Sequence, residues 1–413
     1  YLHTIEIFFG KSLYRQCEKL IRKAKKLAEQ HEKHLHLLAL YDWEMMVITG
    51  LSAIERMGEF SEKDALERKE IIRSYSDLLK YRIIEGKLLH LSKTVGFPRN
   101  TADKEQYDRI MTELPADENE AEGFWARFHH LNIYNFYYEV MGDKQNLYEY
   151  RKRLIEFAEK SPEKINDDQT RYLVALNNLL NIQDELRKTE EVEETLRKIR
   201  SVKARTTDIQ IRIFTYSYLI EISQYILTGE FEKFRPLFPV VEEGMRKFLQ
   251  HMNREYKLAF HYNFFYGYFG LEDYASSLKW LNKILNDDTY HFRKEIYYFT
   301  RILNLIIHFE LGNTDLLAYT IKSTYRFFMK QNRMFKFETA LLNFIRYTFR
   351  FNSRSEMKQG FSELKNNFNE LKNDPFEQQV LSFFDFDSWL DSKISGRTFA
   401  ELVREKNSVT ISH

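Results

Sequence analysis

The 413-residue sequence is poor in glycine, proline and cysteine. Its 14 Gly and 6 Pro make up about 5% of the chain, where average usage is about 12%. Tight β-hairpins and glycine-rich phosphate loops need these residues, so the composition disfavours both. The single cysteine, Cys17, excludes an intrachain disulfide framework and a multi-cysteine zinc site. A lone cysteine is typical of a reducing compartment, and we expect a cytoplasmic protein.

Long apolar runs and an excess of one charge are lacking as well. No apolar segment approaches the roughly 18–20 residues that span a bilayer, so no membrane partner is expected. The 62 basic residues balance 61 acidic ones, and a net charge of +1 provides no overall attraction to nucleic acid. Aromatic residues, by contrast, reach 15% and charged residues 30%. This composition is sufficient for a packed core beneath a well-solvated surface.

Half of the glycines recur at long and nearly regular intervals. These are Gly10, Gly50, Gly96, Gly142, Gly229, Gly270 and Gly312. Their gaps are 40 to 46 residues, apart from one of 87 that equals two periods with one glycine lost. Before the last four of them, one helical turn back, stand Tyr138, Tyr225, Tyr266 and His308. We therefore expect about nine helical hairpins, in which a left-handed glycine ends the first helix and the ring fills the wedge between the two helices.

These motifs resemble the tetratricopeptide-repeat (TPR) family, which places an aromatic residue before a small turn residue and a small residue early in the second helix. The matching positions are Tyr138 with Gly142, Tyr225 with Gly229 and Phe231, Tyr268 with Tyr274 and Ser277, and residues 10–17. The resemblance implies an all-α fold, a right-handed superhelical solenoid of about nine TPR-like hairpins with a period of 40–46 residues. Residues 301–328 and 386–393 are also similar to segments of large bacterial helical-repeat proteins of unknown function.

The expected organisation is one TPR-like solenoid over residues 1–406, followed by a polar tail over residues 407–413. Only nine residues precede Gly10, whereas the first helix of a hairpin needs about fifteen. We therefore expect the chain to be truncated at its N-terminus.

A second periodic feature is a column of asparagines in the first helix of successive hairpins. With one glutamate in the series, its members are Asn135, Asn178, Glu221, Asn263, Asn304 and Asn343. Asparagine is unfavourable inside helices because its amide competes for the backbone, so the recurrence needs a reason. Two interpretations remain open: a ladder of amides on the concave face that binds an extended peptide, or buried amides that bond neighbouring helices.

Residues that could carry catalysis or bind a metal are few. The first group is His31, His34 and His36, whose spacing misses the zinc-protease pattern and which has no evident carboxylate ligand. The second group is Asp385, Asp387 and Asp391, for which a helix N-cap at Asp387 is a better explanation than acid–base chemistry. No Walker loop or dinucleotide fingerprint occurs. We expect neither a metal nor a cofactor, and no enzymatic activity.

Two basic stretches, around residues 19–26 and 197–205, have glutamates nearby and indicate the outer faces of second helices. Nucleic-acid binding would need a stripe that is continuous across repeats, so no nucleic-acid partner is expected. The predicted function is a scaffold or sensor that binds a protein or peptide in the concave face of the solenoid. The alternative is a regulatory module whose missing N-terminal part carries an effector such as a DNA-binding domain.

Overall fold

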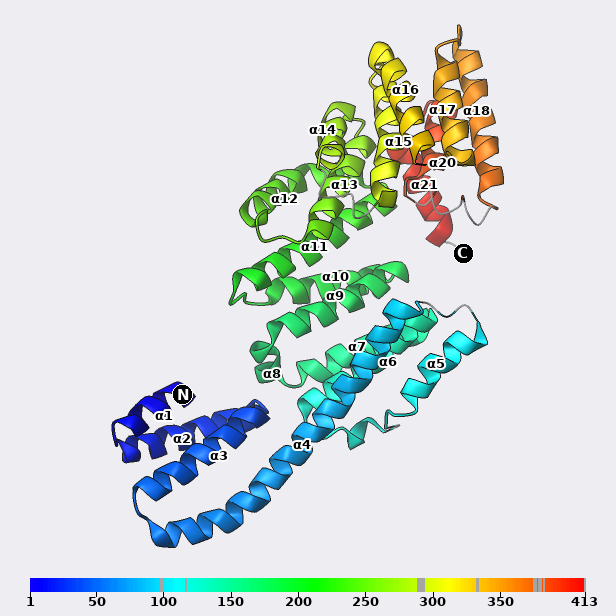
Figure 1. Cartoon of the computed structure of the whole chain (residues 1–413). Coiled ribbons are helices and arrows are strands. Elements are labelled where there is room, and N and C mark those ends of the chain that lie inside the picture. Colours follow the sequence, from blue (N-terminus) through cyan, green and yellow to red (C-terminus); the bar gives the residue numbers. More distant parts are fainter. Residues whose placement is uncertain are drawn as a thin grey trace. The chain divides into compact units, whose positions relative to one another are not determined.

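The computed structural model describes the chain apart from residues 97, 99, 116, 288–293, 332–333, 374–376, 378–380, 382 and 412–413. The described residues form twenty α-helices and no β-strand, so the all-α prediction is confirmed. The helices divide into two compact units, Tyr1–Lys203 and Ala204–His413 (Figure 1). Each unit is described by itself, and a single solenoid over residues 1–406 stays a prediction.

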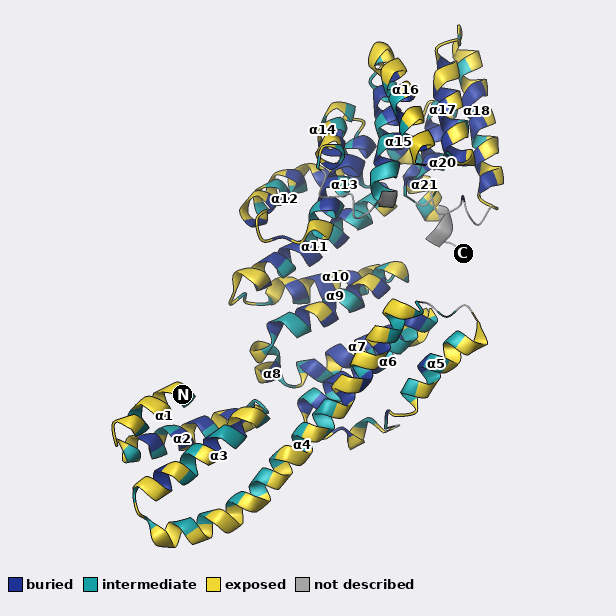
Figure 2. Cartoon of the chain, viewed as in Figure 1, coloured by how far each residue is buried: buried dark blue, intermediate teal, exposed yellow. Residues whose placement is uncertain are grey.

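The first unit is built around one long helix and several shorter ones. Its helices are α1 (Leu2–Gly10), α2 (Tyr14–Gln30), α3 (His34–Gly50), α4 (Ile54–Thr94), α5 (Thr101–Met111), η1 (Glu118–Glu120), α6 (Phe124–Met141), α7 (Lys144–Glu159), α8 (Pro162–Asp167), α9 (Gln169–Glu185) and α10 (Thr189–Ser201). With 41 residues, α4 is about 60 Å long. Its first half is largely exposed on one side, whereas Tyr81, Ile84 and Leu88 in its second half are buried (Figure 2).

The second unit holds most of the aromatic core. Its helices are α11 (Thr207–Thr228), η2 (Phe231–Lys233), α12 (Phe234–Phe248), α13 (Arg254–Gly270), α14 (Tyr274–Leu285), α15 (Lys294–Glu310), α16 (Thr314–Lys330), α17 (Lys336–Thr348), α18 (Arg354–Leu371), α20 (Phe386–Ser395) and α21 (Phe399–Ile411). Helices that follow each other pack together as α13 with α14, α15 with α16 and α17 with α18. Their shared faces are buried and their outer faces are exposed (Figure 2).

The same backbone turn separates packed helices at eight places. One residue adopts a left-handed conformation, and the next N–H bonds the carbonyl five residues earlier at 2.8–3.3 Å. The left-handed residues are Ser12, Glu32, Ser52, Gly142, Arg187, Gly229, Glu272 and Gly312. This geometry satisfies a carbonyl that the helix end leaves without a partner, and it directs the chain into the next helix.

The predicted role of glycine is therefore correct at some positions and wrong at others. Gly142, Gly229 and Gly312 adopt the left-handed conformation, and Arg187 holds it where the sequence had lost a glycine. Gly10, Gly50 and Gly270 do not, because each is the last residue of its helix and lies two residues before the turn residue.

At two of these helix ends, close packing explains the glycine. A Cβ at Gly50 would stand 2.8 Å from the Tyr14 ring, and one at Gly270 would stand 2.1 Å from the Phe231 ring. The ring one turn before the Glu272 turn is accordingly Tyr268, the residue of the TPR match, and not Tyr266, which the glycine spacing predicted.

Replacing glycine by alanine should have opposite effects on stability at two positions. Gly86 lies inside α4 with no neighbouring atom within 4 Å of an added Cβ, so Gly86→Ala should stabilise the protein by about 0.5–1 kcal/mol. Gly142 has φ +70°, so Gly142→Ala should cost at least about 1 kcal/mol. Chemical denaturation of both variants measures the difference, and equal effects would contradict the turn assignment.

Glu32 caps a helix that begins 92 residues later. Its carboxylate accepts hydrogen bonds from the backbone N–H groups of Phe124 (3.0 Å) and Trp125 (3.2 Å), at the start of α6. It also pairs with Lys164 of α8 at 2.8 Å. Burial alone raises the pKa of the Glu32 carboxyl, but these bonds outweigh it and hold the pKa below its usual range. One side chain thus ties the α2–α3 turn to α6 and α8.

Glu32→Gln should reduce the free energy of unfolding by about 2–3 kcal/mol at neutral pH, because Lys164 stays buried without its counter-ion. A lowered folded-state pKa means that the stabilisation is complete above about pH 5 and is lost as the pH falls below about 4. The difference between the wild type and the variant should therefore shrink on acidification. Glu29→Gln, at an exposed position of α2, is the matched control and should change little at any pH.

Residues 383–408 of the second unit fold back over the preceding helices. The centre of the Phe384 ring lies 5.0 Å from that of Phe269 in α13, and the centre of the Phe386 ring lies 5.1 Å from that of Phe337 in α17. Further along, Phe399 packs 5.4 Å from the same Phe269. A face of α13 and α17 is thus covered by the chain itself.

Polar groups fix this C-terminal segment in its middle and near its end. The indole N–H of Trp389 donates to Glu310 of α15 at 2.7 Å, and Lys393 pairs with the same carboxylate. Burial and the Glu310 carboxylate both raise the pKa of the neighbouring Tyr274. At the far end, Nε of Arg404 donates to the carbonyl of Gly229 at 2.9 Å.

Candidate functional site

The six residues of the predicted column occupy the middle or later part of six helices. They are Asn135 in α6, Asn178 in α9, Glu221 in α11, Asn263 in α13, Asn304 in α15 and Asn343 in α17. Asn135 is buried, Asn343 is exposed, and the other four are half-buried. Exposure therefore differs from member to member.

The left-handed turns give a common reference for comparing these positions. Asn135 lies seven residues before Gly142, Asn304 eight before Gly312, and Asn263 nine before Glu272. Each residue rotates the side-chain direction by about 100°, so one residue of offset moves the side chain well away from its counterpart. Glu221 shares the offset of Asn304, and Asn178 shares that of Asn263. A regular spacing in sequence thus corresponds to three directions relative to the turn.

The hydrogen bonding of the asparagines leaves both interpretations open. In the part of the chain that the structure describes, the Oδ1 atoms of Asn135 and Asn304 are buried without a hydrogen-bond partner. Asn343 Oδ1 accepts a bond from Arg346 on its own helix at 3.2 Å. Among the described residues, the column forms neither a set of amides bonded between helices nor a uniformly exposed ladder, and its ligand-binding role stays a prediction.

Asn135→Leu tests whether the buried amide is structural. Leucine has a similar shape and removes an unpartnered acceptor, so stability should be unchanged or rise by up to about 1 kcal/mol. Asn132→Leu on the same helix is the control, because Asn132 donates to Glu85 and its loss should cost about 1–2 kcal/mol. A larger loss at Asn135 than at Asn132, measured by denaturation, would favour a structural amide.

One member of the column, Asn343, lines a pocket of about 450 Å³ between α17 and α18. Polar or aromatic side chains at its rim are Asn343, Tyr347, Arg350, Glu363 and Asn367. Asn343 and Tyr347 on α17 are four residues apart, as are Glu363 and Asn367 on α18, so each pair shares a helix face. Arg350 follows just beyond the end of α17.

The floor of the pocket is apolar. Phe344 is buried there, and the Phe351 ring lies against α18. A Cβ at Gly360 would stand 2.6 Å from the end of the Phe351 ring, so the glycine allows this approach.

The polar rim retains capacity for a ligand. Arg350 lies 5.4 Å from the centre of the Tyr347 ring and has no ion pair within the described residues. Glu363 accepts a bond from Gln359 at 3.1 Å, and Asn367 has no hydrogen-bond partner in the described part of the chain. A guanidinium and two carboxamides therefore surround an aromatic floor.

A second hollow of about 560 Å³ continues along α17 and shares Ala340 with the first. At its end, Glu377 accepts bonds from the backbone N–H groups of Lys336 (2.9 Å) and Phe337 (3.2 Å), and so caps α17. We call the two hollows together the α17 groove.

Sequence reasoning found one residue of this groove and missed the others. Asn343 was named for its place in the column, whereas Tyr347, Arg350, Glu363 and Asn367 were not. The available signal was the recurrence of polar residues every three or four positions on two consecutive helices. Most exposed helix faces carry the same signal, so it could not single out this one.

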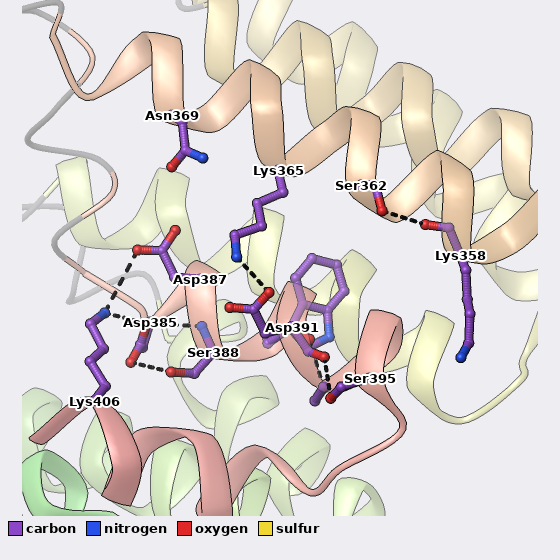
Figure 3. Close-up of polar contacts among 12 residues, drawn as sticks. Lys358, Ser362, Lys365, Asn369, Asp385, Asp387, Ser388, Asp391, Ser395 and Lys406 are labelled. Carbon is purple, nitrogen blue, oxygen red and sulfur yellow. Dashed lines mark hydrogen bonds and ion pairs between the residues drawn. The ribbon is translucent and has the colours of Figure 1, made fainter. Parts of the chain in front are cut away.

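The acidic group near the C-terminus is neutralised by lysines. Asp387 pairs with Lys372 at 2.8 Å. Asp391 pairs with Lys365 at 2.5 Å (Figure 3). Asp385 pairs with Lys406 at 2.8 Å.

The N-cap of α20 is Asp385, which accepts a bond from the Ser388 N–H at 3.1 Å. The prediction of Asp387 as the cap was therefore wrong by two residues. Only Asp385 precedes the first helical turn, where the free N–H groups point.

Three of the histidines have structural partners. His31 pairs with Asp167, and His129 lies 2.8 Å from Glu85. His308 is buried, which lowers its pKa, and accepts a bond from Asn313 at 3.3 Å. Among the described residues, no three His, Cys, Asp or Glu side chains are grouped so that they could hold a metal ion. No helix in the described ranges is long and apolar enough to cross a membrane.

Comparison with known proteins adds no relative, since no protein-family model, no curated protein and no solved structure matches the chain.

Proposed function

We propose that the chain is a TPR-like helical-repeat protein, a right-handed solenoid of helical hairpins, that binds an extended segment of another protein without catalysing a reaction. The binding site of this proposal is the α17 groove, which contains Asn343 of the predicted column.

The spacing of the left-handed turns supports the repeat. From Ser12 to Ser52 is 40 residues, and from Gly142 onward the turns recur after 45, 42, 43 and 40 residues. Repeats of a two-helix unit at such a period stack into a solenoid, since one hairpin cannot bury its apolar face alone.

Equivalent hydrogen bonds in two hairpins support the same unit. Cys17 and Ser277 each stand five residues after a left-handed residue, and both are fully buried. The Cys17 thiol donates to the Ile5 carbonyl at 3.5 Å, and the Ser277 hydroxyl donates to the Phe265 carbonyl at 2.8 Å. Both acceptors lie seven residues before the turn. The small residue early in the second helix, expected from the TPR resemblance, thus has one physical role in both places.

The observation that carries the binding proposal is the set of exposed polar groups around the aromatic floor of the α17 groove, among which Arg350 has no ion pair and Asn367 no hydrogen bond within the described residues. Carboxamides such as those of Asn343 and Asn367 can both donate to and accept from a peptide backbone. The guanidinium of Arg350 suits a carboxylate, from an acidic side chain or a chain terminus. Phe344 and Phe351 offer contact to an apolar side chain of the ligand.

The location of the groove on α17 follows from what covers the neighbouring helices. The aromatic side chains of residues 383–408 already occupy the face of α13 and α17 that includes Phe269 and Phe337. A second protein segment could reach that face only by displacing Phe384 and Phe386, which are buried.

A non-enzymatic, cytoplasmic protein is consistent with the remaining chemistry. Three carboxylates near the C-terminus are each paired with a lysine. Cys17 is a buried thiol whose pKa is raised by burial, which makes it unreactive.

The test is a peptide selected on the full chain from a random display library, with affinities measured by fluorescence anisotropy. Asn343→Ala and Asn367→Ala should each weaken binding about 5- to 10-fold, the effect of one lost hydrogen bond. Both should leave stability within about 0.5 kcal/mol, since they are exposed surface positions.

Asn366→Ala is the matched control, because Asn366 is exposed on α18 outside the pocket lining. It should leave the affinity unchanged. If all three variants bind the selected peptide like the wild type, the α17 groove is not the binding site.

A further inference from the structure

A stripe of four cations runs along the outer side of α2. Arg15, Lys19, Arg22 and Lys26 follow one another at intervals of four, three and four residues, and all are exposed. At 100° per residue they fall within an arc of about 60°. Within the described residues, none of the four has an ion-pair partner. We call them the basic stripe.

Other charges of α2 are compensated within the fold. Lys25 pairs with Glu44 of α3, and Glu18 pairs with Arg56 of α4 at 2.7 Å. The second basic stretch of the sequence is compensated too, since Lys198 pairs with Glu159 at 3.0 Å. The basic stripe thus lies beside charges of α2 that are paired within the fold.

A matching row of carboxylates lies on α4. Glu55, Glu59 and Glu62 follow at intervals of four and three residues, are exposed, and have no ion-pair partner in the described part of the chain. Their neighbours on the same helix are paired, as in the contact between Arg68 and Asp64 at 2.7 Å. We call these three glutamates the acidic stripe.

Within the described residues of one chain, no ion pair joins the two stripes. The buried residues of α2, which include Cys17, Ile21 and Ala24, lie on the side opposite the basic stripe. On α4, Phe60 packs 6.4 Å from Tyr41 of α3, and it too lies roughly opposite the acidic stripe. Both stripes therefore point away from the bundle that α2, α3 and α4 form.

The spacing of the stripes fits one to the other. Intervals of four and three residues correspond to rises of about 6.0 and 4.5 Å in both helices. Three cations of one helix can therefore stand opposite three carboxylates of another over their whole length. Nucleic acid is a poorer match, because no aromatic side chain stands between the cations to stack on bases.

We propose that two copies of this chain associate through the basic stripe of one and the acidic stripe of the other. The contact is independent of the α17 groove. It is an electrostatic contact between exposed groups, so salt should weaken it.

The test is sedimentation velocity of the full chain over a broad concentration range. At about 0.05 M NaCl the mean mass should rise with protein concentration, and at about 0.5 M NaCl it should not. The variants Lys19→Glu/Arg22→Glu and Glu59→Lys/Glu62→Lys should each self-associate at least about tenfold more weakly. An equimolar mixture of the two variants should associate again, because each now carries the charges that the other needs.

Lys152→Glu/Lys358→Glu, at two exposed positions on α7 and α18, has the same charge as the first variant and should behave like the wild type. A wild-type mass that stays that of one chain at low salt would overturn the proposal, as would a mixture that fails to associate. Binding of single-stranded oligothymidylate or phosphatidylserine vesicles that depends on Lys19 and Arg22, without self-association, would assign the stripe to that ligand instead.

Discussion

The way in which each helix ends is the constraint on which the rest of the structure depends. An α-helix leaves its last carbonyls without partners. At eight helix ends of this chain, a left-handed residue is followed by an N–H that donates a hydrogen bond to the carbonyl five residues earlier. The bond fixes where the chain turns and therefore which faces of the two helices meet. Because it uses only backbone atoms, Ser12, Arg187 and Glu272 form the same turn as Gly142, each at a cost of roughly 1–2 kcal/mol.

This backbone origin explains how far the sequence could predict the fold. The absence of strands and the turns at Gly142, Gly229 and Gly312 were predictable, because only glycine adopts the left-handed conformation without strain. The turns at Ser12 and Glu272 were not, since a non-glycine residue there leaves no mark in the sequence. Gly50 and Gly270 were misassigned for a related reason: a glycine required by a neighbouring ring looks the same in sequence as one required by its own dihedral angle.

The candidate site was less predictable than the fold. A periodic asparagine could be recognised along one chain, and Asn343 was found in this way. The α17 groove, however, arises where faces of two helices meet, and its depth depends on Gly360 admitting the Phe351 ring. The three directions of the column also depend on where each turn lies. A shift of the turn by one residue rotates the side chains of the preceding helix by about 100° relative to the turn.

The bond between Arg404 and Gly229 spans 175 residues and joins the last helix of the second unit to its first turn. An open array of hairpins contacts only near neighbours, so its terminal hairpin can fray while the others stay folded. In this unit, the C-terminal segment, residues 383–408, also covers α13 and α17. Its release would therefore expose the aromatic core at several hairpins at once. The second unit should consequently unfold as one cooperative block, with amide protection that does not decline gradually towards its C-terminal end.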